Sequence, residues 1–175
     1  RHSDLHGPHG TYGQAAYWKP AALLRALEAV IGRDALWFSL RAYSENWIYR
    51  HPTPHDFFNL VEEAAGRDLD WFWYPFWYET AALDQAITNV RVTDGAATEV
   101  TIANLGKAFM PVHLLLTLSG GDTIREVVPV EVWLLGARVH TVTIDLPRGE
   151  TLTSVEIDPE EDFPDVDREN NIWGR

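Results

Sequence analysis

The chain has 175 residues, a formal net charge of -12 and no cysteine. The acidic balance excludes a nucleic-acid binder that neutralises phosphates with a basic stripe, and it argues against an anionic membrane surface. Without cysteine the chain has no disulfide framework, no thiolate metal site and no thiol nucleophile. No run of about 18 apolar residues occurs, so we expect a soluble chain without a membrane-spanning helix. Because it begins at Arg1 and shows no signal peptide, we expect a piece of a longer protein, with any targeting region elsewhere.

The first half of the chain repeats apolar residues at helical spacing. Leu24, Leu27 and Ile31 share one face, so we expect a helix that has Pro20 in its first turn and ends at Gly32. Tyr17 comes directly before this helix. We expect three further helices, at residues 34–47, 54–65 and 69–78.

After Glu79 the pattern changes to alternation of apolar and polar residues, which is typical of strands. We expect strands at residues 87–93, 99–103, 112–118, 123–130, 131–135, 139–145 and 151–157. Asp94-Gly95 is a hairpin signal between the first two of them. The predicted fold class is therefore α+β, a helical subdomain of about four helices followed by an antiparallel β-sandwich. We place the helical domain at residues 1–82 and the β-sandwich, with an acidic C-terminal tail, at residues 83–175.

The acidic tail covers residues 158–167, with the sequence DPEEDFPDVD. Its carboxylates could chelate calcium through oxygen ligands. The segment lacks an EF-hand pattern, because it has no glycine at the turn and contains two prolines. We favour a solvated tail that is packed by Phe163 and Trp173.

One segment carries a resemblance to a known family. Tyr17-Trp18-Lys19-Pro20, followed by Leu24 and Leu27, resembles the tyrosine-x-lysine-small segment of the zinc aminopeptidases of the aminopeptidase N family. Further short motifs follow in the order of that family, and the resemblance covers about Tyr12 to Glu79. These motifs are Ile31–Ala35, Ala42–Tyr43, Trp47, Arg50–Pro54, Asp56–Phe58, Gly66–Leu69, Trp71–Phe72 and Trp77. The chain departs from the family at Tyr78–Leu83, where a glycine–proline turn would be expected.

The chemistry of such enzymes needs a zinc site that this sequence lacks. A zinc peptidase of this type uses H-E-x-x-H, with two histidine ligands on one helix face and a glutamate base. The nearest match, from His51 to His55, has Pro52 in place of the glutamate, and two prolines prevent a continuous helix across it. His2, His6 and His9 lie in a glycine-rich stretch that predicts an exposed segment rather than a rigid site. We therefore predict no metal ligand in this chain.

Tyr17 is the remaining catalytic candidate. From the residues alone a buried structural tyrosine is favoured, whereas the resemblance implies that Tyr17 assists catalysis by stabilising an oxyanion. Tyr12 is a second candidate, one shell further out.

The resemblance implies the C-terminal region of a zinc-dependent aminopeptidase that removes N-terminal residues from peptides. The zinc, its ligands and the base would belong to an upstream segment of the same protein, and this chain alone would be inactive. The expected partners are a peptide substrate and that upstream segment, with no nucleic acid and no membrane. The alternative is a non-catalytic interaction or scaffold domain that descends from the peptidase.

Overall fold

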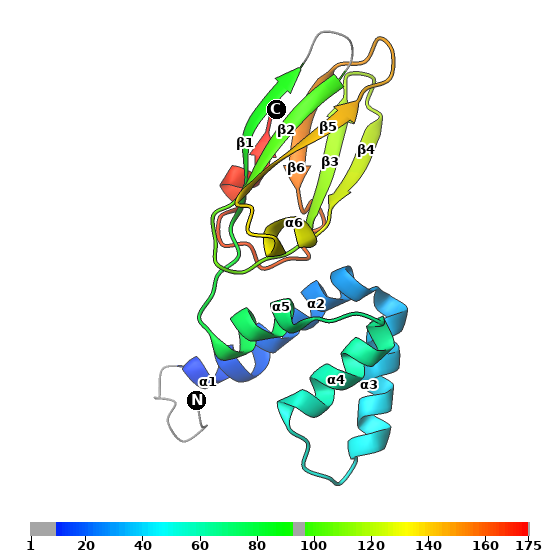
Figure 1. The fold of residues 1–175 in the computed structure, drawn as a ribbon, viewed down its shortest axis with the longest axis vertical. Helices are drawn as coiled ribbons and strands as arrows, with labels where there is room; N and C mark the ends of the chain where they lie inside the picture. The colour runs from blue at the N-terminus through cyan, green and yellow to red at the C-terminus, as the bar shows by residue number, and fades with distance from the viewer. Residues whose placement is uncertain (1–9, 93–96, 175) are drawn as a thin grey trace. The chain divides into compact units, whose positions relative to one another are not determined.

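The computed structural model describes residues 10–92 and 97–174 and divides into two compact units. The helical unit contains residues 1–69 with 162–164, and the two-sheet unit contains residues 70–161 with 165–175. Helices precede antiparallel sheets along the chain (Figure 1), so the predicted α+β class is confirmed. Within the described ranges, no helix combines the length and the apolar character that a bilayer crossing requires. The predicted domain boundary between residues 82 and 83 stays a prediction.

The helical unit begins with one unbroken helical stretch. It consists of α1 (Thr11–Gly13), a π-helical turn η2 (Gln14–Trp18) and α2 (Lys19–Ile31). The helical stretch therefore starts earlier than the sequence predicts. Pro20 lies inside it and not in its first turn. Two further helices follow, α3 (Arg33–Trp47) and α4 (Pro54–Ala65), and α3 packs against both α2 and α4.

Local signals fix the ends of these helices. Thr53 and Asp56 form a capping box at the start of α4, in which the backbone N–H of Thr53 donates to Asp56 Oδ2 at 2.7 Å. Gly66 ends α4 in the left-handed conformation, with φ 65°, and its N–H donates to the Glu62 carbonyl. Buried apolar residues of the helical unit come from all three long helices and from the segment after α4: Leu23, Ala26, Leu27, Leu36, Phe58, Val61 and, after α4, Leu69.

The two-sheet unit opens with a short aromatic helical segment and continues as strands. The segment consists of α5 (Asp70–Trp73) and a second π-helical turn, η3 (Tyr74–Tyr78). The strands are β1 (Gln85–Val92), β2 (Ala97–Asn104), β3 (Val112–Leu118), β4 (Thr123–Val128), β5 (Val139–Asp145), β6 (Leu152–Ile157) and β7 (Ile172–Trp173). They form two antiparallel sheets of order β1-β2-β5 and β4-β3-β6-β7. The Asp94-Gly95 turn lies outside the described residues.

Both sheets contribute to one buried core, and that core overturns one predicted strand. Residues Glu131–Leu134 form a helix, α6, because Trp133 inserts into the core at 1% exposure. Its Nε1 donates to the Met110 carbonyl at 3.0 Å, and Gln85 Nε2 donates to the same oxygen at 3.0 Å. The aromatic segment also contributes to this unit, since Trp71 packs against the sheet core.

The acidic segment after β6 is more ordered than a solvated tail. Asp158 is 2% exposed and forms an ion pair of 3.0 Å with Arg168, which belongs to the short helix η4 (Arg168–Asn171). Phe163 is buried, as expected. The chain then returns along β6 as β7, so Trp173 lies in the sheet.

Candidate functional site

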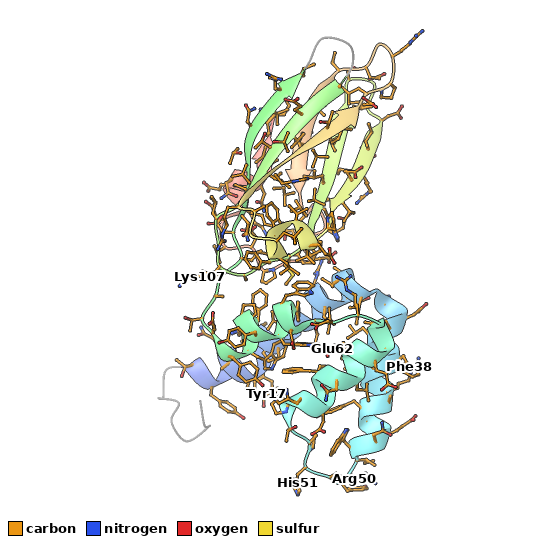
Figure 2. The ribbon with its side chains drawn as sticks, viewed as in Figure 1. Tyr17, Phe38, Arg50, His51, Glu62 and Lys107 are labelled. Atoms are coloured by element: carbon orange, nitrogen blue, oxygen red, sulfur yellow. The ribbon has the colours of Figure 1, made fainter. Side chains whose placement is uncertain are left out.

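Tyr17 lies on the π-helical turn near the start of the first helical stretch (Figure 2). The backbone N–H of Lys19 donates to the carbonyl of Gln14, which is five residues back rather than the four of an α-helix. Pro20 explains this local widening, because its ring clashes with the carbonyl four residues before it and it has no N–H to donate. Single π turns inside α-helices are frequent at functional sites.

The π turn brings Tyr12 and Tyr17 together. Residues five apart on an ideal α-helix point about 140° apart, since successive residues differ by about 100°. Here the two rings meet edge to face, with centroids 6.2 Å apart and an interplanar angle of 74°. The structure therefore places both predicted site residues in contact.

In the described part of the chain, both tyrosine side chains are exposed to solvent. Tyr17 is 66% exposed and Tyr12 is 46% exposed, and neither α1 nor η2 contains a buried residue. Within the described part of the chain, the side chain of Tyr17 is therefore not buried. The hydroxyl stands at the end of a helix that is anchored two turns later by buried Leu23, Ala26 and Leu27. Such an arrangement holds a hydrogen-bond donor in place while leaving it accessible.

Among the described residues, His51 and His55 do not form a helical zinc motif. His51 is exposed in the loop between α3 and α4, beside Arg50 (Figure 2). His55 belongs to α4, and its ring lies edge to face with the ring of Phe58, with the two ring centroids 5.8 Å apart. Because α4 begins only at Pro54, the two histidines do not share a helical turn. His2, His6 and His9 lie outside the described residues.

The sequence did not predict the π turn that brings the tyrosines together. Pro20 next to Tyr17 is a signal for such a distortion, since proline inside a helix disrupts the hydrogen-bond ladder. The same association recurs at η3, which contains Pro75. A proline inside a helical pattern could thus have been read as the sign of a π turn within the helix rather than as the sign of the helix start.

Comparison with known proteins gives matches both in sequence and in structure. No protein-family model matches the chain. Aminopeptidase N from Streptomyces lividans is 29% identical over 101 residues, which are 57% of this chain and 12% of that protein. The crystal structure of Legionella pneumophila aminopeptidase A in complex with aspartic acid is similar with a TM-score of 0.64 and 16% sequence identity. That match covers 88% of this chain and 18% of the other chain, so the chain spans less than a fifth of either protein. The sequence match and the shared fold together confirm the predicted resemblance of this chain to a C-terminal region of the aminopeptidase N family.

Proposed function

We propose that this chain is the C-terminal part of a zinc-dependent aminopeptidase and that Tyr17 donates a hydrogen bond to the reacting carbonyl oxygen. The observation that carries the proposal is the exposed Tyr17 on a π turn, in a segment that resembles the aminopeptidases in the order of its motifs. The sequence match to Aminopeptidase N supports the same assignment.

In this proposal, the zinc site and Tyr17 belong to different segments of one protein. It has no H-E-x-x-H, so the zinc ligands and the general base belong to an upstream segment of the same protein. When bound there, zinc polarises the peptide carbonyl and activates a water molecule.

Tyr17 contributes one fixed donor to this reaction. Its phenol O–H is neutral at pH 7 and donates to the oxygen that becomes negatively charged as the tetrahedral intermediate forms. The edge contact with Tyr12 favours one χ1 rotamer of Tyr17, and the χ1 rotamer sets the position of its hydroxyl. Tyr12 is therefore a positioning residue in this proposal.

The test uses the full-length protein that contains this chain, together with the isolated chain. We expect the full-length protein to hydrolyse an aminoacyl-nitroanilide with a free amino group, to lose that activity in 1,10-phenanthroline and to regain it with zinc. The isolated chain should have no activity. A chelator-sensitive rate from the isolated chain would contradict the proposal, and a folded full-length protein without zinc or activity would favour the scaffold alternative.

A further inference from the structure

The helix α3 exposes large apolar side chains at both of its ends. Four of them, on α3 and the turn that follows it, are between 48% and 98% exposed: Trp37, Phe38 (labelled in Figure 2), Ile48 and Tyr49. The other side of α3 is used inside the helical unit, since Leu36 and Ser39 are buried and α3 packs against α2 and α4. Residues four and eleven positions apart share a helix face, so Trp37, Arg41 and Ile48 form one exposed stripe. Exposed apolar side chains gathered in this way are typical of a contact surface.

The apolar pair at the C-terminal end of α3 lies on a strained turn. The backbone N–H of Arg50 donates to the Trp47 carbonyl at 2.9 Å, and Ile48 has φ -55° and ψ 127°, which makes a type II turn. Tyr49 is the third residue of this turn and has φ 60°, a left-handed conformation that glycine or asparagine normally adopts there. Its ring is 98% exposed, so the described chain does not use it for packing. Backbone strain of this kind is found mostly at functional positions.

Two opposite charges lie between the apolar pairs. Arg41 and Glu45 are both exposed, and among the described residues neither forms an ion pair. Arginine before glutamate is also the less favourable order for a pair within one helix. Arg41 and Glu45 lie two residues on either side of Tyr43. Phe38 and Ile48 lie five residues on either side of it, so the order of apolar and charged side chains is symmetric about the middle of the helix.

We infer that this face of α3 binds the same face of a second copy of the chain, with the two helices antiparallel about a two-fold axis. In such a contact each end of α3 meets the opposite end of its partner. The pair Trp37 and Phe38 then covers the apolar pair of the partner's turn, which removes both pairs from water. Each Arg41 faces a Glu45 of the other copy, and the symmetry makes this charge pair twice. The arrangement of charges thus favours a second copy over an unrelated apolar partner.

The experiment is sedimentation velocity on the 175-residue chain and on the full-length protein that contains it. Contact along one helix is smaller than a standard interface, so we expect a dimer with a Kd of about 1–100 µM. Arg41→Glu and Glu45→Arg should each raise this Kd by more than about tenfold, because each opposes two pairs of like charges. A mixture of these two variants should form a heterodimer, in which both charge pairs are again opposite in sign. Phe38→Ser should also raise the Kd by more than about tenfold.

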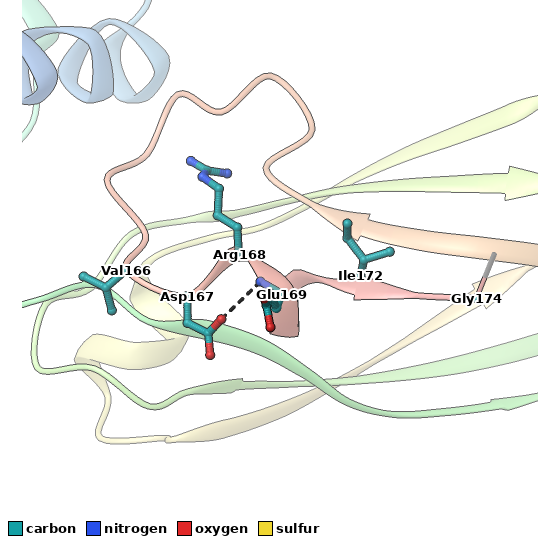
Figure 3. Close-up of a pocket in the computed structure, with 6 residues that line it drawn as sticks. All are labelled: Val166, Asp167, Arg168, Glu169, Ile172 and Gly174. Carbon is teal, nitrogen blue, oxygen red and sulfur yellow. Dashed lines mark hydrogen bonds between the residues drawn. The ribbon is translucent and has the colours of Figure 1, made fainter.

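Two substitutions in the two-sheet unit are the matched controls. Arg148→Glu removes an exposed arginine and changes the net charge by as much as Arg41→Glu does. Val166→Ser is the control for Phe38→Ser, because Val166 is 65% exposed and, with Ile172, lines an open hollow of about 690 Å³ (Figure 3). Both controls should dimerise as the wild type does, which would place the contact on α3 and not at this hollow.

Three results would overturn the inference. The first is a wild-type chain that stays monomeric up to about 300 µM, above the expected range of Kd. The second is an Arg41→Glu variant that dimerises like Arg148→Glu, or a mixture of the two charge variants that forms no heterodimer. The third is a dimer of the 175-residue chain together with a monomeric full-length protein, which would assign this face to another segment of the same protein. Tyr49→Gly decides the question if Phe38→Ser fails to fold, because it removes the exposed ring, relieves the backbone strain and should still weaken the dimer.

Discussion

The ring of Tyr12 lies edge-on to the ring of Tyr17, with 6.2 Å between the centroids, across a helical turn that contains one residue more than an α-helical turn. This contact depends on the π turn before Pro20, since five residues of regular α-helix would send the two rings to different faces. The π turn thus brings two exposed aromatic side chains into contact. The pair is the feature of this chain that its proposed catalytic role requires.

Replacement of Gly106 by alanine should destabilise the two-sheet unit. A methyl carbon there would lie 2.7 Å from the backbone nitrogen of Asp84 and closer still to the carbonyl oxygen of Ala82. Both obstacles are backbone atoms, so the loop after β2 must move away from residues 82–84. We expect Gly106→Ala to lower the free energy of unfolding by about 1–3 kcal/mol, measured by urea denaturation.

Gly13→Ala is the matched control for that substitution. Gly13 is helical, with φ -58°, and an added methyl carbon would meet no atom within 4 Å. Alanine there should raise the stability by about 0.5–1 kcal/mol, because glycine is the poorer helix former. Equal effects of the two substitutions would contradict the close approach at Gly106.

Trp133 and Gln85 should be coupled through the oxygen they share. Each donates to the Met110 carbonyl, so either Trp133→Phe or Gln85→Met alone leaves that buried oxygen with one donor. The double variant leaves it with neither of them, and an unpaired buried carbonyl costs about 1–3 kcal/mol. The double variant should therefore lose more stability than the sum of the single losses. A double-mutant cycle by chemical denaturation measures this coupling, and strict additivity would refute it.

Glu150 should stabilise the fold in a pH-dependent manner. Its pKa is lowered from 4.5, first by the hydrogen bond from the Ser119 hydroxyl and then by that from the Gly120 N–H. A lowered pKa means that the folded state binds fewer protons, so the stabilisation is present above pH 4.5 and is lost as the pH falls through the folded-state pKa. The wild type should exceed Glu150→Gln in stability at pH 7, and the difference should shrink in acid.

Glu126→Gln serves as the control for Glu150→Gln, because Glu126 is an exposed glutamate on β4 of the same unit. The difference in stability between Glu126→Gln and the wild type should change less over the same range of pH. A stability difference for Glu150→Gln that does not vary with pH would show that the carboxylate charge has no part in joining the β3–β4 turn to residue 150.

Elements with local signals could be predicted from the sequence. The helix α4 begins at Pro54 after the Thr53–Asp56 capping box and ends at Gly66, and all of these signals lie within four residues of the helix ends. Strand β3 was also predicted, because Val112, Leu114, Leu116 and Leu118 alternate with other residues along the sequence, and in the structure all four are buried.

Features that depend on distant partners could not be predicted in this way. The run Glu131–Leu134 has strand-like residues, but burial of Trp133 against Met110 makes it helical. The side chain of Asn170 donates a hydrogen bond to Asp84, which lies 86 residues earlier in the chain, so no local pattern reveals this contact.

The central claim is the catalytic role of Tyr17, and Tyr17→Phe in the full-length protein tests it most directly. The substitution removes one hydroxyl and keeps the ring, so folding, zinc content and the edge contact with Tyr12 should remain near those of the wild type. The account predicts that kcat falls by about 10²–10³, with a smaller change in KM, because the lost hydrogen bond acts on the transition state. Tyr12→Phe, which preserves its ring contact, should lower kcat much less. A Tyr17→Phe enzyme with the kcat of the wild type would contradict the account.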